Sequence, residues 1–224
     1  MNVDENYKKS IYIVLSILII ILHTKNFNIL GNKFYENIKE ITNPDDILVL
    51  VNKNNKLNKN FIPKDLQLLD INYSYENKML RDLAKNSFEK LCTDAKSVGY
   101  KIIGVSAYRD YDYQNKLYNE YVKQKGKEYA DRASARPGHS EHQTGLAIDV
   151  MGSNNDSDEF EYAIEFEWMR DNAHKYGFIM RYPKNKEHIT GFKYEPWHYR
   201  YVGKEVAKYI YDNDLALEEY LNIK

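Results

Sequence analysis

The amino-acid sequence predicts an α+β fold, in which one domain of interspersed helices and strands follows a separate N-terminal segment. Three observations predict this class: helix-like and strand-like hydrophobic patterns are interspersed, the strand-like segments are short, and hairpin-like turns join several of them. Short strands and hairpin turns favour this class over a doubly wound parallel sheet. The length of 224 residues suits one domain with a full core and a short appendage.

The first thirty residues form the appendage. Residues 8–9 are lysines, and residues 11–22 are an uncharged, largely apolar run. This run is short for a membrane span of about 20 residues, but it matches the apolar region of a secretory signal. No small-x-small cleavage site follows, so we expect residues 1–30 to be an uncleaved signal-anchor, with a cleaved signal peptide as the alternative. The rest of the chain would then lie outside the cytoplasm, on the cell membrane or, after cleavage, secreted.

Residues 31–45 are polar and lack periodicity, which predicts a linker, and the domain is expected to span residues 46–224. Near its start, Ile47–Val51 is an apolar run that predicts a short buried strand, and residues 52–60 have the composition of turns. The strongest helical pattern covers Asn77–Val98, where apolar residues recur at three- and four-residue steps. The domain is therefore expected to open with a strand and an amphipathic helix.

The later elements follow from the same two periods, alternation for strands and three- to four-residue spacing for helices. In order, they are a strand at 101–108, a helix at 112–124, a loop at 125–143, a strand at 146–151, a helix at 159–176, strands at 178–182 and 191–201 around a turn, and a last helix at 204–211. No internal repeat is visible, so this order describes a single domain.

Charge and cysteine content restrict the chemistry. The 32 Lys and Arg residues nearly cancel the 33 Asp and Glu residues, so no large field of one sign favours a nucleic-acid partner. The single cysteine, Cys92, excludes an internal disulfide and a cysteine-based zinc site. A metal site would therefore have to use histidine and carboxylate ligands.

One block of the sequence, SARPGHSEHQTGLAIDVM at residues 134–151, contains candidate ligands. In its strand portion the apolar side chains alternate with Ala147 and Asp149, so Asp149 projects from the opposite face. A carboxylate there needs a cation or hydrogen-bond donors to offset its desolvation. His142 lies seven positions earlier, and a bend at Gly145 could turn its imidazole towards the same cleft. For this pair alone, a hydrogen-bonded structural aspartate and a surface histidine are an equally good interpretation.

A second block, YEPWHYRYVG at residues 194–203, adds Glu195 and His198. Pro196 cannot donate to a sheet, so we expect a bent segment in which these two residues converge on one site. Two histidines and one carboxylate are a known ligand set of catalytic zinc, and a further carboxylate can take a proton from the water in the fourth position. Glu195 is the candidate for that base. The alternative, in which Asp149 and Glu195 form the acid pair of a glycosidase, leaves both histidines unexplained.

These motifs resemble those of the D-alanyl-D-alanine carboxypeptidase family of zinc peptidases (VanY type). The resemblance rests on S-x-H-x-x-G-x-x-x-D at Ser140–Asp149 and on E-P-W-H at Glu195–His198. It extends over about residues 47–203 and includes the segments LVNKNNKL, SAYRDYDYQ and YGFIMRYPKNKEHITGFKYEPWHYRYVG. The family implies a central, mostly antiparallel sheet flanked by helices. It also implies Zn2+ on His142, Asp149 and His198, with Glu195 as the general base.

Three further residues are expected to contact the substrate or the transition state. Arg109 offers rigid paired donors for a peptide carboxylate or for the oxyanion of hydrolysis, and a surface salt bridge with Asp110 or Asp112 is the alternative. By resemblance, Ser140 hydrogen-bonds the substrate. Gln114 matches a recurring position of the family, where it binds substrate or only braces the loop.

The resemblance implies a zinc D,D-carboxypeptidase that removes the C-terminal D-alanine from peptidoglycan stem peptides or their precursors, and the N-terminal segment predicts that this enzyme is anchored in the membrane. An L,D-carboxypeptidase or an endopeptidase acting on the same polymer is the nearest alternative, because the sequence does not reveal the shape of the pocket. A non-catalytic peptidoglycan-binding module is the alternative of another class. That alternative predicts the loss of a ligand or of the base, whereas all four positions are present.

Overall fold

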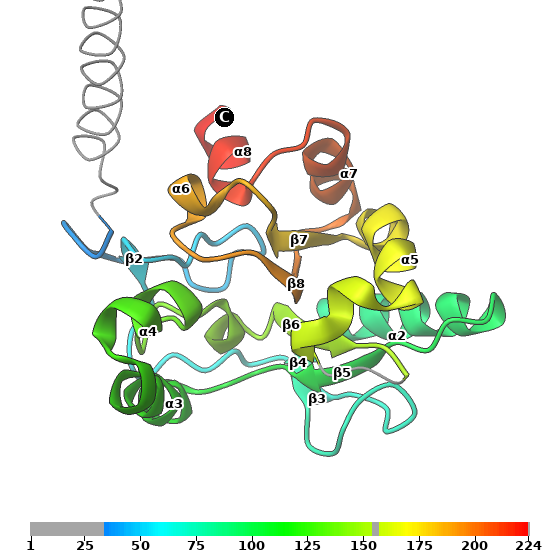
Figure 1. Ribbon diagram of the computed structural model, residues 1–224, viewed down its shortest axis with the longest axis horizontal. Coiled ribbons are helices and arrows are strands. Elements are labelled where there is room, and N and C mark those ends of the chain that lie inside the picture. The colour runs from blue at the N-terminus through cyan, green and yellow to red at the C-terminus, as the bar shows by residue number, and fades with distance from the viewer. Residues whose placement is uncertain (1–33, 154–156, 224) are drawn as a thin grey trace, which may run out of the picture. The chain divides into compact units, whose positions relative to one another are not determined.

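A four-stranded antiparallel sheet with strand order β5-β6-β8-β7 organises the chain (Figure 1). Its strands are β5 (Ile103–Ser106), β6 (Ala147–Met151), β7 (Phe178–Tyr182) and β8 (Glu195–Tyr201). The structure is a computed structural model that describes residues 34–153 and 157–223. The predicted class, a sheet flanked by helices in one domain, is confirmed. β6 and β8 are the two central strands, so each of them is paired with a strand on both sides.

Helices surround this sheet, and two pairs of short strands lie outside it. The α-helices are α2 (Asp82–Ser97), α3 (Tyr111–Lys125), α4 (Lys127–Ala133), α5 (Ile164–Asn172), α6 (Glu187–Thr190), α7 (Lys204–Asp212) and α8 (Leu217–Ile223). The 3-10 helices are η1 (Glu141–Thr144), η2 (Ser157–Tyr162) and η3 (Ala173–Tyr176). The short strands are β1 (Lys39–Glu40) and β2 (Asn55–Lys56), which pair in parallel, and β3 (Leu66–Leu68) and β4 (Met79–Arg81), which pair antiparallel. In Figure 1, α3 and α4 lie side by side at the lower left.

The main core lies between α2 and the sheet. The residues of α2 that are buried in it are Ala84, Phe88, Leu91, Cys92 and Ala95. They belong to one cluster with Leu146, Ile148 and Val150, the apolar set predicted to alternate along β6. The alternation is therefore confirmed, and it leaves Asp149 to project from the other face of the strand.

A smaller core attaches the C-terminal helices to the sheet. Its buried members are Ile179, Val202, Ala207, Ile210, Leu217 and Tyr220. These residues come from β7, α7, α8 and the residue that follows β8, so the C-terminal helix α8 is packed on the domain. The sequence patterns did not predict this helix.

The strand predicted at Ile47–Val51 is not formed. Residues 47–48 make a turn, yet Val49 and Val51 are only 7% and 0% exposed. Arg200 donates from Nη2 to the carbonyl oxygens of Ile47 and Val49, at 2.8 and 2.9 Å. The apolar pattern correctly indicated burial. The buried carbonyl groups of this segment accept hydrogen bonds from a side chain instead of from a neighbouring strand.

Several boundaries differ from those predicted. Helix α2 begins at Asp82 and not at Asn77, because Met79–Arg81 is β4 in a hairpin with β3. Residues 159–176 were predicted as one helix but form parts of η2, α5 and η3. Ala163 interrupts them with an extended backbone conformation (ψ 146°).

Two other segments also differ from prediction. Residues 125–143, expected to be a loop, contain α4 and most of η1. The strand expected at 191–201 begins only at Glu195, because Gly191 ends helix α6 with a φ of +80°. Both corrections fall next to the candidate site, where short helices are too brief to show a clear period in the sequence.

Residues from Phe34 onward belong to the same compact unit. Lys39 in β1 pairs with Asn55 in β2, and the Tyr35 amide donates to Oδ1 of Asn54 at 3.0 Å. Residues 34–45, which the sequence assigned to the linker, are thus attached to the domain by backbone pairing. The signal-anchor predicted at residues 1–30 lies outside the described residues. Within the described part, no helix has the length and hydropathy needed to cross a membrane.

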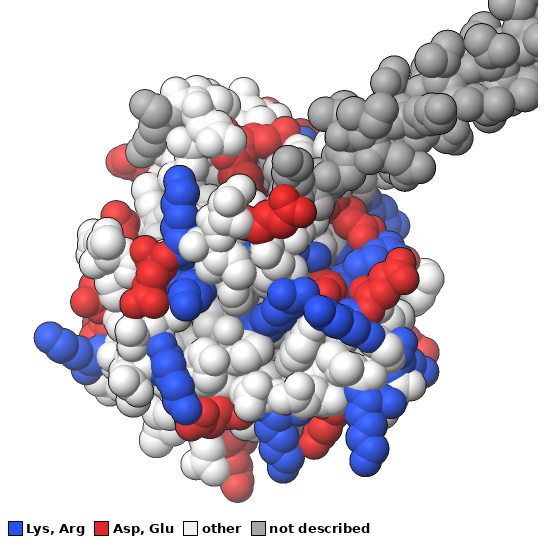
Figure 2. Space-filling view, turned by 90° about the vertical axis from the view of Figure 1, so that its left-hand side faces the viewer, with Lys and Arg blue, Asp and Glu red and all other residues white. Residues whose placement is uncertain are grey.

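Acidic and basic side chains are interspersed on the face shown in Figure 2. Exposed ion pairs in the described chain include Arg132 with Glu187, at 2.6 Å, and Arg170 with Asp171, at 2.8 Å. Exposed pairs of this kind contribute about 0–1 kcal/mol each. The buried charges near β6 and β8 are therefore the more informative ones.

Candidate active site

The two histidines and the aspartate predicted as metal ligands lie together. His142 is in η1, Asp149 is in β6 and His198 is in β8, where Asp149 and His198 are paired across the sheet. One possible ligand atom of each residue lies within 4.8 Å of the other two, and all three residues are buried. The fold therefore assembles the predicted cluster from three separate elements.

The η1 turn sets the position of His142. Its N-cap residue, Ser140, accepts a hydrogen bond at Oγ from the His142 amide, at 3.4 Å. Gly145 follows η1 with a φ of +66°, a left-handed conformation that glycine adopts without strain. A Cβ at this position would lie 2.7 Å from Leu66 and 3.0 Å from Arg81. The bend predicted at Gly145 is confirmed, and it takes the chain from η1 directly into β6.

Each of the two imidazoles turns one nitrogen towards the cluster. Nδ1 of His142 lies 2.6 Å from the carbonyl oxygen of Ala107, so it donates there and Nε2 carries the lone pair. That Nε2 is 3.3 Å from Oδ1 of Asp149 and has no hydrogen-bond partner among the described residues. For His198 the atom that faces the cluster is Nδ1, at 2.9 Å from the same Oδ1.

Burial and mutual contacts shift the pKa values of these groups. Burial raises the pKa of Asp149, but its contacts with His142 and His198 outweigh burial and hold that pKa well below its usual range. Burial and the Arg109 charge lower the pKa of His142 to about 4. Burial also lowers the pKa of His198, but its contacts with Asp149 and Glu141 raise it to about 9. Near neutral pH the cluster thus offers an ionised carboxylate and a neutral imidazole.

This arrangement fits a divalent transition metal. The unpartnered Nε2 of His142 is a buried lone pair that needs a partner, and the ionised Asp149 beside it supplies the charge that a cation requires. His142, Asp149 and His198 form the two-histidine, one-carboxylate donor set of catalytic zinc sites. The carbonyl of Ala107 would hold His142 from outside, as outer hydrogen bonds do for most metal-binding histidines.

Glu195 lies beside this cluster, at the start of β8. Its Oε2 is 4.0 Å from Nδ1 of His198, and the residue is 8% exposed. The pairing of β7 and β8 is irregular here, between Met180 and Tyr182, so residues three apart can face the same cavity, as was expected of the bend. Burial raises the pKa of Glu195 to about 7.

Arg109 follows β5 and reaches the cluster from the other side. Its amide donates to the carbonyl oxygen of His142 at 3.3 Å, and its Nη1 is 3.8 Å from Oδ2 of Asp149. The alternative partners are engaged elsewhere: Asp110 caps α3 by accepting from the Tyr113 amide, and the Asp112 carboxylate pairs with a lysine. The guanidinium therefore faces the cavity.

The two other predicted residues differ in position. Ser140 lines the cavity. Gln114, buried in α3, donates from Nε2 to Oγ of Ser134 at 3.2 Å and to the carbonyl oxygen of Ala135 at 2.8 Å. Ser134 and Ala135 line the cavity, whereas Gln114 does not. The contacts of Gln114 therefore match the alternative in which it braces the loop.

The cavity that these residues enclose has a volume of ≈180 Å³. Aromatic side chains of Tyr182, Phe192 and Trp197 form part of its wall. The ring of Tyr182 lies 4.9 Å from that of His198. An arrangement with a polar floor and aromatic walls is suited to a small peptide end.

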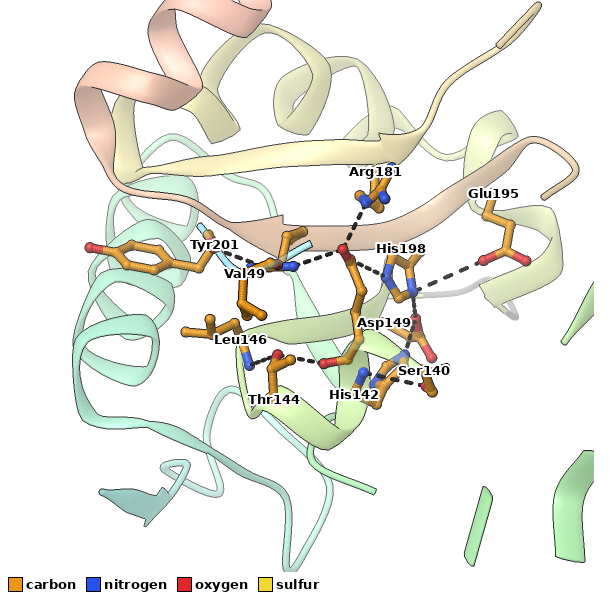
Figure 3. A network of polar contacts seen from close by, with 12 residues as sticks. Val49, Ser140, His142, Thr144, Leu146, Asp149, Arg181, Glu195, His198 and Tyr201 are labelled. Carbon is orange, nitrogen blue, oxygen red and sulfur yellow. Dashed lines mark hydrogen bonds and ion pairs between the residues drawn. The ribbon is translucent and has the colours of Figure 1, made fainter. Parts of the chain in front are cut away.

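Sequence reasoning missed Glu141, which lies in a buried polar network between His198 and two arginines. Figure 3 shows this network from close by, with His198 and Arg181 labelled. Glu141 is 1% exposed, and Arg181 and Arg200 are fully buried. A signal for this network exists in the sequence: Arg181 and Arg200 interrupt strand patterns that are otherwise aromatic and apolar. A buried arginine in a strand requires a buried acceptor, but the sequence does not say which one.

Comparisons with known proteins agree with this geometry. The family model described as VanY, D-alanyl-D-alanine carboxypeptidase, matches residues 77–204. The putative carboxypeptidase YodJ of Bacillus subtilis is 46% identical over 195 residues, which are 84% of this chain and 71% of that protein.

Two solved structures are also similar. The LD-carboxypeptidase LdcB has 45% sequence identity and a TM-score of 0.78, covering 84% of this chain and 91% of LdcB. A mutant of the vancomycin resistance D,D-pentapeptidase VanY in complex with Zn(II) has 34% identity and a TM-score of 0.65, covering 78% of this chain and 98% of that one. Both similarities extend over most of the described domain.

Proposed function

We propose, because the chain belongs to the D-alanyl-D-alanine carboxypeptidase (VanY) family, that it is a zinc-dependent carboxypeptidase that removes the C-terminal D-alanine from peptidoglycan stem peptides or their precursors. The observation that carries the proposal is the buried cluster of His142, Asp149 and His198 with Glu195 beside it. These four residues have the types and positions that hydrolysis of a peptide bond requires. The zinc complex of the related VanY structure supports the choice of metal.

His142, Asp149 and His198 would hold the metal. The chemistry that zinc supplies when bound by such a set is Lewis acidity, which polarises a carbonyl and lowers the pKa of water. The Ala107 carbonyl fixes which nitrogen His142 presents, and sheet pairing with Asp149 fixes the place of His198. The ligand geometry is therefore preorganised by backbone contacts.

Glu195 serves as the general base. It takes the proton of the attacking water and gives it to the nitrogen of the leaving D-alanine. A base works best when its pKa lies near the operating pH, and burial raises the pKa of Glu195 to about 7. The same carboxyl group can therefore accept and return the proton.

Arg109 and Ser140 bind the substrate or its transition state. The Arg109 guanidinium faces the cavity and offers paired donors to the oxyanion of the tetrahedral state or to the substrate's terminal carboxylate. The Ser140 hydroxyl accepts from the His142 amide, so its own proton is free to reach a substrate oxygen. Both roles rest on their place in the cavity wall and on the family resemblance.

A second candidate is an L,D-carboxypeptidase, which would remove the terminal D-alanine of a tetrapeptide. The observation that favours it is the similarity to LdcB, at 45% identity and a TM-score of 0.78, against 34% and 0.65 for VanY. The two candidates share the proposed catalytic residues and differ in the residue that precedes the scissile bond. A non-catalytic module is disfavoured, because the base and all three ligand positions are present and adjacent.

The test uses the full chain loaded with zinc and defined tri-, tetra- and pentapeptide stems, with products identified by mass spectrometry. Loss of D-alanine from the pentapeptide alone supports the D,D-cut, and loss from the tetrapeptide supports the L,D-cut. An internal cut would replace both with an endopeptidase, and intact stems would refute the proposal.

Replacement of Glu195 tests the mechanism. We expect Glu195→Ala to lower turnover by at least about 10³-fold, because the base is removed. Zinc content, measured by atomic emission, should stay at the wild-type stoichiometry, since Glu195 is not among the ligands. Undiminished release of D-alanine by this variant would remove Glu195 from the mechanism.

A further inference from the structure

We propose that Glu141 is a positioning residue, which accepts the Nε2 proton of His198 and so leaves Nδ1 of that imidazole as the ligand atom. The inference deepens the proposed function and rests on its metal site. Nothing in the ligand motif itself requires a carboxylate at position 141. The role follows from contacts that join η1 to β7 and β8.

The two atoms in question face each other and have no other partner. Oε2 of Glu141 lies 3.6 Å from Nε2 of His198. Both atoms are buried, and neither has a hydrogen-bond partner among the described residues. A buried donor or acceptor without a partner costs about 1–3 kcal/mol, so an N–H on Nε2 pointing at this oxygen satisfies both groups at once.

The other oxygen of Glu141 explains why the carboxylate can only accept. Oε1 receives hydrogen bonds from Nε of Arg181 at 2.8 Å and from Nη1 of Arg200 at 2.7 Å. Two guanidinium groups bonded to this one buried oxygen keep the carboxylate charged, because an uncharged carboxyl group would leave both arginines without this counter-charge. An ionised carboxylate has no proton to donate. The facing nitrogen of His198 must therefore carry one.

The arginines are themselves held from outside the cavity. Arg181 donates from Nη1 and Nη2 to the two oxygens of Glu218 in α8, at 2.8 and 2.7 Å. Arg200 donates from Nη2 to backbone carbonyls of the segment 47–49. Two buried arginines are thus balanced by two glutamates, and this fully bonded network fixes the direction in which Glu141 points.

Glu141→Gln should reverse the hydrogen bond. The amide oxygen of glutamine would stay with the N–H groups of Arg181 and Arg200, so its NH2 group would face His198. Two N–H groups cannot bond each other, and the imidazole should move its proton to Nδ1, the atom that the metal needs. Loss of such an outer partner weakens metal binding by about 10- to 100-fold.

Glu218→Gln is the matched control. It removes the same charge from the same network, on the far side of Arg181, and its side chain does not contact His198. We expect it to lower stability to an extent comparable with Glu141→Gln while leaving zinc affinity within about threefold of wild type. A purely structural role of Glu141 predicts instead that both variants lose affinity alike.

The experiment measures zinc affinity of the full chain by competition with a chromogenic chelator, and the His198 tautomer of the zinc-loaded protein by 15N NMR of the imidazole. We expect Nε2–H in the wild type and weaker binding in Glu141→Gln only. The inference is overturned if Nδ1 of His198 carries the proton in the wild type, or if wild type and Glu141→Gln bind zinc with equal affinity. Either result leaves the metal site itself intact. A wild type that binds no zinc refutes the metal site of the proposed function as well. If the variant does not fold, the wild-type spectrum decides alone.

Discussion

Two buried glutamates beside the cluster show how surroundings set the chemistry of one side chain. Burial raises the pKa of Glu195 to about 7, and the charge of His198 offsets this only in part. Glu141 is buried as well, but Arg181 and Arg200 hold its pKa well below the usual range. One glutamate is suited to exchange a proton near neutral pH, and the other is suited to remain an acceptor.

Arg109 gives a prediction about the reaction itself. Arg109→Lys keeps a positive charge but loses the rigid pair of donors, so we expect kcat/KM to fall by about 10²- to 10³-fold. Zinc content should not change, because the ligands are untouched. Arg170→Lys is the control, since Arg170 pairs with Asp171 at the surface and should retain full activity. Equal activities of the two variants in the peptide assay would remove Arg109 from the reaction.

Lys53 gives a prediction about pH and stability. Its ammonium group donates to the Gly191 carbonyl and lies over the rings of Tyr35 and Phe192, and burial lowers its pKa from 10.5 to about 8. Below pH 8 the folded and unfolded chains both hold this proton. Between pH 8 and 10.5 only the unfolded chain holds it, so the group's contribution to stability rises with pH. The gain by pH 9.5 is about 2 kcal/mol.

The measurement is the free energy of unfolding in urea at pH 7 and pH 9.5, for wild type and for Lys53→Met. We expect the stability of the wild type, relative to the variant, to increase over this interval. Tyrosines with raised pKa values, such as Tyr35, act in the opposite direction only above pH 10. The same pH dependence in both proteins would show that the Lys53 ammonium group is not destabilised by burial.

Short elements position the cluster more than long helices do. η1 spans only four residues, yet it presents His142 and Glu141 and ends at the glycine that leads into β6. β8 presents Glu195 and His198 on either side of Pro196, where pairing with β7 is irregular. The active-site geometry therefore depends on a turn and an irregular strand, which are held by the regular sheet around them.

Gly145 gives the corresponding prediction. Gly145→Ala adds a Cβ that would lie 2.7 Å from Leu66, in a left-handed conformation, so we expect a loss of about 2–5 kcal/mol in the free energy of unfolding. Gly99→Ala is the control, because Gly99 also has a positive φ but a Cβ there meets nothing within 4 Å. It should cost only about 1–2 kcal/mol. Urea unfolding that ranks the two variants equally would contradict the packing argument.

In the molecule as a whole, distant parts of the chain meet around one buried network. Glu218 of α8, Arg181 of β7 and Glu141 of η1 are linked in series. The segment near Val49 joins them through Arg200. Removal of one member of such a network leaves a buried charge without its partner, which costs about 3–5 kcal/mol. The C-terminal helix and the early segment are therefore integral to the domain that holds the site.

The N-terminal segment leads to a prediction about location. We propose that residues 1–30 attach the domain to the cell membrane, because they contain an uncharged apolar run preceded by lysines. We expect the full chain to sediment with membranes and to resist carbonate extraction, whereas a chain that starts at residue 31 should be released. If both forms are found in the soluble fraction, residues 1–30 are either cleaved as a signal or do not anchor the domain.

Local patterns in the sequence were sufficient for a large part of this protein. The apolar period of α2, the alternation of β6 and the bend at Gly145 are confirmed, because each depends on neighbours close in the chain. The motifs also singled out His142, Asp149 and His198, which the fold brings together.

The three-dimensional packing was needed for the rest. Ile47–Val51 has the composition of a strand, but its backbone carbonyls bond to Arg200. The acidic partner of Arg109 is Asp149 and not Asp110 or Asp112. The contacts of Glu141 also depend on the packing, because its two arginine partners come from β7 and β8. Periodicity reports which face of an element is buried, whereas the pairing of donors and acceptors far apart in the chain depends on how the elements pack.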